Sequence, residues 1–200
     1  MSEEVEKILV VPAEWANNLC QPGFTSDIHP NFLAKLPEIA FFMDRPAAEI
    51  NPKFRQIIPY ILVKYQNKYL TVTRRTTQTE VRLHNKVSFG IGGHINPIDG
   101  DTTNILDAGL RRELSEELAT DNPPKFDELK LLGLLRDDVN ELEQVHLGVV
   151  MLWETTEPIA IRETDKMDGE YLTLNEIGAR RERLENWSRL VYDHLGVMVS

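Results

Sequence analysis

The chain has 200 residues, of which 42% are hydrophobic and 27% charged, and this composition predicts one globular domain with at most one extension. Its 32 acidic and 22 basic residues give a net charge of -10, which argues against a protein that binds nucleic acid by neutralising phosphates. Cys20 is the only cysteine, so we expect no disulfide, no cysteine-based metal site and a cytoplasmic location. No apolar run approaches the length of a membrane span, so no membrane partner is expected.

The first quarter of the chain is rich in proline, which permits only short helices and strands. Six prolines interrupt it: Pro12, Pro22, Pro30, Pro37, Pro46 and Pro52. We expect residues 1–54 to form an N-terminal extension packed on a core domain of residues 55–200. The sequence leaves open whether this extension shapes a pocket or a homodimer interface.

From residue 56 onward, strands and helices alternate irregularly. Residues 56–65 and 68–75 are β-branched and aromatic runs that predict a hairpin, and residues 87–97 predict a short strand that runs into glycines. A helix is predicted over residues 102–120, with Asp101 or Thr102 as its N-cap. Strands follow at 129–138 and 145–154, and a strand with one or two helices at 169–195. Hairpins on both sides of one central helix favour an α+β fold.

The predicted central helix carries three glutamates beside a stripe of leucines. Leu106, Leu110, Leu114 and Leu118 mark its buried face. At about 100° per residue, Glu117 falls inside the leucine arc. An ionised carboxylate there costs several kcal/mol unless it is paired with a cation or binds a metal. A salt bridge is one explanation, and a divalent cation held by carboxylate oxygens is the one we favour.

These residues form part of a recognisable motif. The stretch RELSEELAT, residues 112–120, resembles the second half of the Nudix box of the MutT-like hydrolases, with Ala119 for a glycine and Thr120 for a hydrophobic residue. That box reads Gly, five residues, Glu, seven residues, then Arg-Glu-hydrophobic-x-Glu-Glu-x-Gly-hydrophobic. Gly93 would open it and Asp101 would replace its first Glu, with five extra residues before Arg112. The resemblance implies an α/β/α sandwich with a mixed sheet.

The resemblance also implies an activity: metal-dependent hydrolysis of a phosphoanhydride bond in a nucleoside diphosphate linked to another group. Mg²⁺ or Mn²⁺ would neutralise phosphate charge and activate water. The implied metal ligands are Glu113, Glu116, Glu117 and a backbone carbonyl of Gly92. Arg112 would hold the acidic cluster in place. The general base varies within the family, and we select Glu163, with Glu170 as the alternative.

Substrate contacts are expected from the hairpin end and the glycine loop. The candidates are Arg74, Arg75, Gly93 and His94, and the partner is a small nucleotide-type molecule. Two alternatives stay open at this point. One is a nucleotide-binding sensor on the same fold without chemistry, and the other is an isopentenyl diphosphate isomerase. The isomerase needs a cysteine near the active centre, and Cys20 is remote in sequence from the box.

Overall fold

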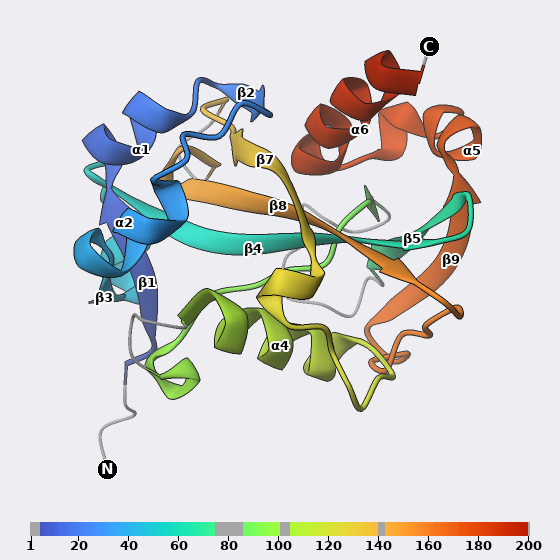
Figure 1. The fold of residues 1–200 in the computed structure, drawn as a ribbon, viewed down its shortest axis with the longest axis horizontal. Coiled ribbons are helices and arrows are strands. Elements are labelled where there is room, and N and C mark those ends of the chain that lie inside the picture. Colours follow the sequence, from blue (N-terminus) through green and yellow to red (C-terminus); the bar gives the residue numbers. More distant parts are fainter. Residues whose placement is uncertain (1–4, 75–85, 101–104, 140–142, 200) are drawn as a thin grey trace.

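Residues 5–74, 86–100, 105–139 and 143–199 are described in the computed structural model of the protein. Its strands are β1 (Lys7–Pro12), β2 (Gly23–Thr25), β3 (Phe41–Asp44), β4 (Phe54–Tyr65), β5 (Lys68–Arg74), β6 (Val87–Ser88), β7 (Lys130–Arg136), β8 (His146–Thr155) and β9 (Met167–Thr173). Its helices are α1 (Ala13–Leu19), α2 (Phe32–Ile39), α3 (Arg45–Glu49), α4 (Ile105–Glu117), α5 (Leu174–Gly178) and α6 (Asn186–Val199). Figure 1 shows how these elements are arranged in space.

Within the described residues, nine strands form one mixed sheet. The order is β2, β7, β8, β4, β1 and β3, and β5 joins β4 to β6 and β9. The β4 and β8 strands are parallel, with Gln56 opposite His146, and the other neighbouring strands are antiparallel. The predicted β4–β5 hairpin is confirmed, and Gln66 in its turn has φ 55°.

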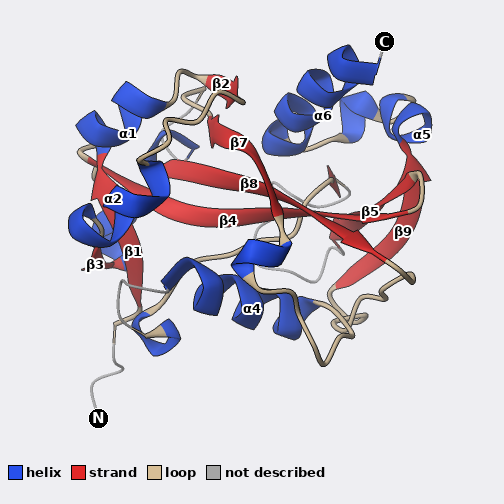
Figure 2. Ribbon diagram, viewed as in Figure 1, coloured by secondary structure: helices blue, strands red, loops and turns tan. Residues whose placement is uncertain are grey.

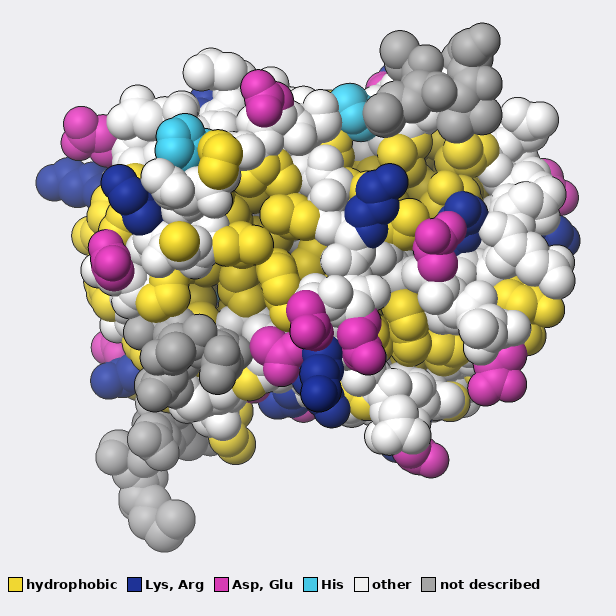
Figure 3. All heavy atoms as spheres, in the orientation of Figure 1, with side chains coloured by type: hydrophobic (Ala, Val, Ile, Leu, Met, Phe, Trp, Pro, Cys, Tyr) yellow, Lys and Arg dark blue, Asp and Glu magenta, His cyan; other side chains and the backbone are white. Residues whose placement is uncertain are grey.

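The sheet lies between two layers of helices because β4 is apolar on both faces. Ile57 and Ile61 pack with the leucine stripe of α4, whereas Ile58 and Leu62 pack with Val191 of α6. Figure 2 shows α4 on one side of the sheet and α5 and α6 on the other. In Figure 3, hydrophobic side chains are concentrated in the middle of the visible face, over β7 and β8 beside α2. The expected α+β sandwich with a mixed sheet is confirmed.

The N-terminal region belongs to the same sheet as the rest of the chain. Its helices have seven, eight and five residues, as short as its prolines predict. The β1 strand lies between β3 and β4, and β2 extends the sheet beyond β7. Leu9, Phe32 and Leu36 join the same buried cluster as Leu110 of α4. A boundary at residue 54 therefore crosses a continuous sheet, and the division into residues 1–54 and 55–200 stays a prediction.

The predicted central helix is confirmed as α4. The helix ends at Glu117, three residues before the predicted end. The leucine stripe is buried: Leu106 is 8% exposed, and Leu110, Leu114 and Leu118, which directly follows the helix, are each 0% exposed. The two N-cap candidates, Asp101 and Thr102, lie outside the described residues. Among the helices that the structure describes, none is long and apolar enough to cross a membrane.

Candidate active site

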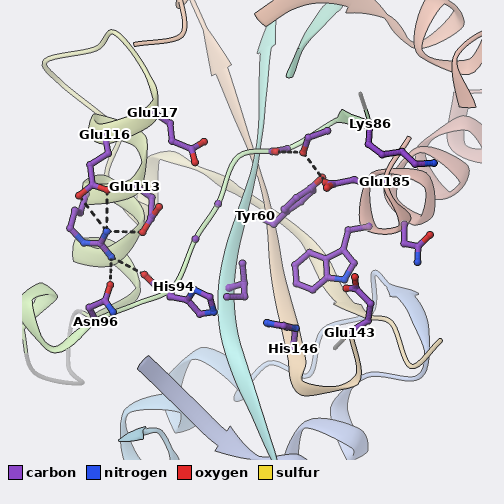
Figure 4. A pocket seen from close by; sticks show the side chains of 18 of the residues that line it. Tyr60, Lys86, His94, Asn96, Glu113, Glu116, Glu117, Glu143, His146 and Glu185 are labelled. Atoms are coloured by element: carbon purple, nitrogen blue, oxygen red, sulfur yellow. Dashed lines mark hydrogen bonds and ion pairs between the residues drawn. The ribbon is translucent and has the colours of Figure 1, made fainter. Parts of the chain in front are cut away.

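A cavity of about 630 Å³ lies between α4, the loop of residues 90–96, β4 and the start of α6. Figure 4 shows the three glutamates of α4 on one side of β4 and Lys86 with Glu185 on the other. Tyr60 of β4 lies between the two groups. Arg45 and Glu6 from the N-terminal region also line the cavity, so this region helps to shape the pocket.

The glycines of the 90–96 loop allow its backbone to pack against both β4 and α4. A Cβ atom on Gly92 would lie 1.9 Å from the carbonyl oxygen of Pro59. A Cβ atom on Gly93 would lie 2.2 Å from Oε2 of Glu113. Gly92 has no room for a side chain, because the Pro59 oxygen belongs to the backbone, whereas a side chain at Gly93 would have to displace the Glu113 carboxylate. The loop therefore brings main-chain groups directly against a carboxylate of the helix.

Arg112 ties this loop to the helix. Its Nε donates to Oδ1 of Asp99 at 2.8 Å, and its Nη1 donates to Oε1 of Glu113 at 2.6 Å. Its Nη2 donates to the carbonyl oxygen of His94 at 2.7 Å and to Oδ1 of Asn96 at 3.0 Å. Partial burial acts to lower the pKa of Arg112, but the bonds to Asp99 and Glu113 raise it above its usual value. The guanidinium is thus a fixed positive centre.

The N-terminal region is joined to Arg112 through Asn96. The Asn96 amide nitrogen donates to Oε1 of Glu6 at 3.1 Å and to the carbonyl oxygen of Lys7 at 2.9 Å. Glu6 in turn accepts from Nη1 of Arg45 at 2.9 Å. A continuous set of hydrogen bonds therefore links α3 and β1 to the arginine on α4.

The three glutamates differ in burial. The Glu113 side chain is 12% exposed and that of Glu116 is 57% exposed, while Glu117 is half-buried. The helical projection set Glu117 apart from the solvent-facing Glu116, in agreement with these exposures. It did not identify the burial of Glu113, where the glycine loop covers α4. Burial raises the pKa of Glu113, and the neighbouring Arg112 offsets part of this effect.

The first acid of the motif was predicted at Asp101, which lies outside the described residues, so this assignment stays a prediction. Asp99 is a second candidate, because its carboxylate also pairs with Arg112 and its side chain is 2% exposed. Asp99 is the sixth residue after Gly93, which is the spacing that the motif requires. Strict counting from Gly93 would have found it, and the five extra residues then lie between Asp99 and Arg112.

His94 lies on the cavity wall as a neutral side chain. Its Nε2 donates to Oε1 of Gln56 at 2.8 Å, and its ring centre is 6.1 Å from that of His146. Burial, followed by the positive charge of Arg45, lowers the pKa of His94 to about 3. A neutral imidazole here can exchange hydrogen bonds with a ligand but brings no charge to phosphate.

The two candidate bases, Glu163 and Glu170, are not brought together with this group. Glu163 does not line the cavity, and its carboxylate pairs with Lys166. Glu170 pairs with Arg180 on the exposed surface. Arg74 ends β5, and its side chain is not described; Arg75 lies outside the described residues. The structure therefore gives no support to Glu163 as a base.

Besides Glu6, sequence reasoning missed two carboxylates that line the cavity, Glu143 and Glu185. Glu143 precedes β8 and Glu185 precedes α6. Neither lies in a motif, and each reaches the cavity only through the folding of distant segments.

The cavity is suited to a cation in donor type and in charge. Among the described residues, six glutamates and three Lys or Arg side chains line it, an excess of three negative groups. The donors on α4 are carboxylate oxygens, which Mg²⁺ and Mn²⁺ prefer together with water and substrate phosphate. Within the described part of the chain, no three such side chains form a preassembled metal cage. The residues therefore fit a cation that also takes ligands from substrate and water.

The chain is similar to known proteins in sequence and in structure. No family model matches the sequence. Protein YmaB of Bacillus subtilis (strain 168) is 34% identical over 159 residues, covering 76% of this chain and 77% of YmaB. The crystal structure of Tm1382, assigned to the Nudix hydrolases, superposes with a TM-score of 0.80 at 30% identity, covering 95% of this chain and 98% of Tm1382. The NUDIX domain of Shewanella oneidensis NrtR, complexed with ADP ribose, shares the fold: its TM-score is 0.52 at 12% identity, over 73% of this chain and 89% of that domain.

Proposed function

The chain belongs to the Nudix hydrolase family, and we propose that it cleaves a nucleoside diphosphate linked to another group in a reaction that depends on Mg²⁺ or Mn²⁺. As a member of the family it is a hydrolase acting on phosphorus-containing anhydrides. The observation that carries the proposal is the contact set of Arg112, which fixes Glu113 and Asp99 beside the glycine loop.

The acidic residues of α4 would hold the cation. Glu113 and Glu117 are its main ligands, and Glu116 and the carbonyl of Gly92 complete the set. When bound, the cation neutralises phosphate charge and activates water for attack on phosphorus. Arg112 binds Oε1 of Glu113 and so fixes the direction of its second oxygen.

The remaining residues have binding or proton-transfer roles. His94 and the Gly93 backbone contact substrate from the glycine loop, with Arg74 and Arg75 as phosphate contacts from the hairpin. Glu163 is the base that the sequence suggests, and Glu143 is the competing candidate because it lines the cavity. Separate Glu163→Gln and Glu143→Gln variants decide between them: loss of the base lowers kcat by about a hundredfold or more.

The substrate is a small nucleotide-type molecule. A cavity of about 630 Å³ is within the usual range for such ligands. NrtR's NUDIX domain carries ADP ribose, so ADP ribose is a natural first probe. The isomerase alternative is disfavoured because Cys20 is 1% exposed and is not among the residues lining the cavity.

A product-release assay tests the proposal. Wild-type protein is incubated with a panel of nucleoside diphosphate derivatives in the presence of Mg²⁺, Mn²⁺ or chelator. We expect cleavage of one substrate class that chelator abolishes. The exposed Glu157 supplies a matched control, Glu157→Gln, which should retain activity. Cleavage that persists in chelator would contradict metal dependence, and metal binding without turnover on any substrate would indicate the sensor alternative.

A further inference from the structure

The cavity wall opposite α4 holds a carboxylate by hydroxyl groups alone. Oε1 of Glu185 accepts from Oγ of Ser88 at 2.7 Å, from Oγ of Ser188 at 3.0 Å and from the Tyr60 hydroxyl at 3.1 Å. Ser188 Oγ also accepts from the backbone N–H of Phe89 at 2.6 Å. Three hydroxyl groups therefore converge on one carboxylate oxygen.

This network is buried and specific. Tyr60, Ser88 and Ser188 are 5%, 7% and 0% exposed. Buried polar groups are costly unless each is satisfied, so such a network fixes one geometry. Among the described residues, no lysine or arginine forms an ion pair with Glu185, and its Oε2 accepts no hydrogen bond. In the described part of the chain, neutral hydroxyl groups and not an ion pair therefore orient Glu185.

The neighbours of Glu185 suit an uncharged group. Leu184, Asn186 and Trp187 line the same end of the cavity, and the exposed Lys86 lies on the same side of β4. Trp187 packs edge-to-face on Tyr60 with ring centres 5.6 Å apart. Apolar and aromatic surfaces beside a single hydrogen-bonding acceptor are typical of sites that bind sugars or bases. A phosphate placed beside this carboxylate would meet a like charge.

We propose that Glu185 binds a hydroxyl or amino donor on the part of the substrate remote from the phosphoanhydride, and selects against a phosphate there. This inference rests on the proposed function, because the phosphoanhydride is taken to lie at α4. Figure 4 shows that Glu185 lies across Tyr60 from Glu117. A substrate cleaved at α4 therefore presents its remote end, and not its reacting atoms, to Glu185.

The test compares Glu185→Gln with wild type on matched ligands. The probes are ADP ribose, its deoxyribosyl analogue, its hypoxanthine counterpart and ADP ribose 2′-phosphate. For the ligand whose donor contacts Glu185, KM should rise about 10- to 100-fold with kcat within about threefold. For the analogue that lacks this donor, KM should not change, and for the phosphorylated ligand it should fall. Loss of the effect with the deoxyribosyl analogue identifies a sugar hydroxyl, and loss with hypoxanthine identifies the base amine.

Controls separate this inference from the proposed function. Glu182→Gln changes an exposed neighbour whose side chain is 91% accessible and should leave selectivity unchanged. Calorimetry with the non-hydrolysable α,β-methylene analogues measures binding when no probe is cleaved, and the melting curve of Glu185→Gln reports whether it folds. A Glu185→Gln variant that alters kcat equally on every ligand, or a wild type that does not distinguish the matched analogues, would overturn the inference. If no probe is cleaved but calorimetry still shows that wild type distinguishes the matched analogues, the proposed hydrolase activity would be contradicted and the role of Glu185 would be retained.

Discussion

The two walls of the cavity hold their carboxylates by different chemistry. On the α4 wall, Glu113 shares the guanidinium of Arg112 with Asp99, and burial still raises the pKa of Glu113. On the α6 wall, Glu185 accepts three hydrogen bonds from hydroxyl groups that carry no charge. The first arrangement groups negative charge that one arginine does not balance, which suits a divalent cation. The second fixes one acceptor beside apolar groups, which suits a neutral donor.

The largest expected effect is the loss of a carboxylate from the α4 wall. Glu117→Gln should lower kcat by about a thousandfold or more, because it removes a ligand that stabilises charge in the transition state. The fold should be retained, since a half-buried amide costs less than a half-buried carboxylate. Steady-state kinetics and a melting curve measure both. Glu116→Gln is the comparison variant, and because the Glu116 side chain is exposed, we expect a smaller fall in kcat than for Glu117→Gln. Unchanged turnover in Glu117→Gln would remove the metal-site assignment.

Arg112→Lys should have a smaller effect on activity than Glu117→Gln, but it should also lower the stability of the fold. A lysine cannot span Asp99, Glu113 and the His94 carbonyl together, because it lacks the planar fork of donors. We expect the free energy of unfolding to fall by about 2–4 kcal/mol, since buried partners lose charged hydrogen bonds. We also expect the affinity for the activating metal to fall about 10- to 100-fold. Denaturant unfolding and metal titration of activity measure these quantities. Equal stability and metal response in both proteins would show that Arg112 does not organise this wall.

On the α6 wall, Ser188→Ala should act mainly on stability. The substitution leaves the Phe89 N–H without its acceptor and removes one hydroxyl from Glu185, at a cost of about 1–3 kcal/mol. Because no group on α4 contacts Ser188 in the described structure, the metal requirement should not change. Chemical denaturation with parallel metal titrations checks this, and a shifted metal requirement would mean that the walls are not independent.

The smallest effect, measured over one pH unit, is a pH dependence of stability that comes from His94 on the glycine loop. Burial lowers the pKa of His94 to about 3 in the folded protein, while an unfolded histidine titrates near 6.5. The unfolded chain therefore binds the extra proton first, so stability falls as pH decreases from about 6.5 toward 3, by about 1.4 kcal/mol per pH unit. Denaturation of metal-free protein at pH 6 and pH 5 measures this slope, and His94→Gln should remove it. A slope equal in the variant would contradict the assignment.

Sequence patterns predicted the parts of the molecule that depend on local spacing. The leucine stripe identified α4, and the run from Arg112 to Glu117 identified its acidic cluster. Burial of Glu113 depends on the glycine loop packed on the helix, which a helical projection does not contain. Counting six residues from Gly93, as the motif requires, leads to Asp99.

The α6 wall was not predictable in the same way. Tyr60, Ser88 and Glu185 come from β4, β6 and the segment before α6, and only the tertiary fold brings them together. The insertion of β1 between β3 and β4 likewise depends on pairing between segments. A proline-rich sequence predicts short elements in this region but not their place in the sheet.

The most direct test of the contrast between the walls is Mn²⁺ binding measured by calorimetry on wild type, Glu113→Gln and Glu185→Gln. The account predicts that Glu113→Gln weakens Mn²⁺ binding by at least about tenfold, because a carboxylate on the cation is lost. Glu185→Gln should bind Mn²⁺ as wild type does. Wild-type affinity in Glu113→Gln, or loss of affinity in Glu185→Gln, would contradict the assignment of the cation to α4 and of the neutral donor to α6.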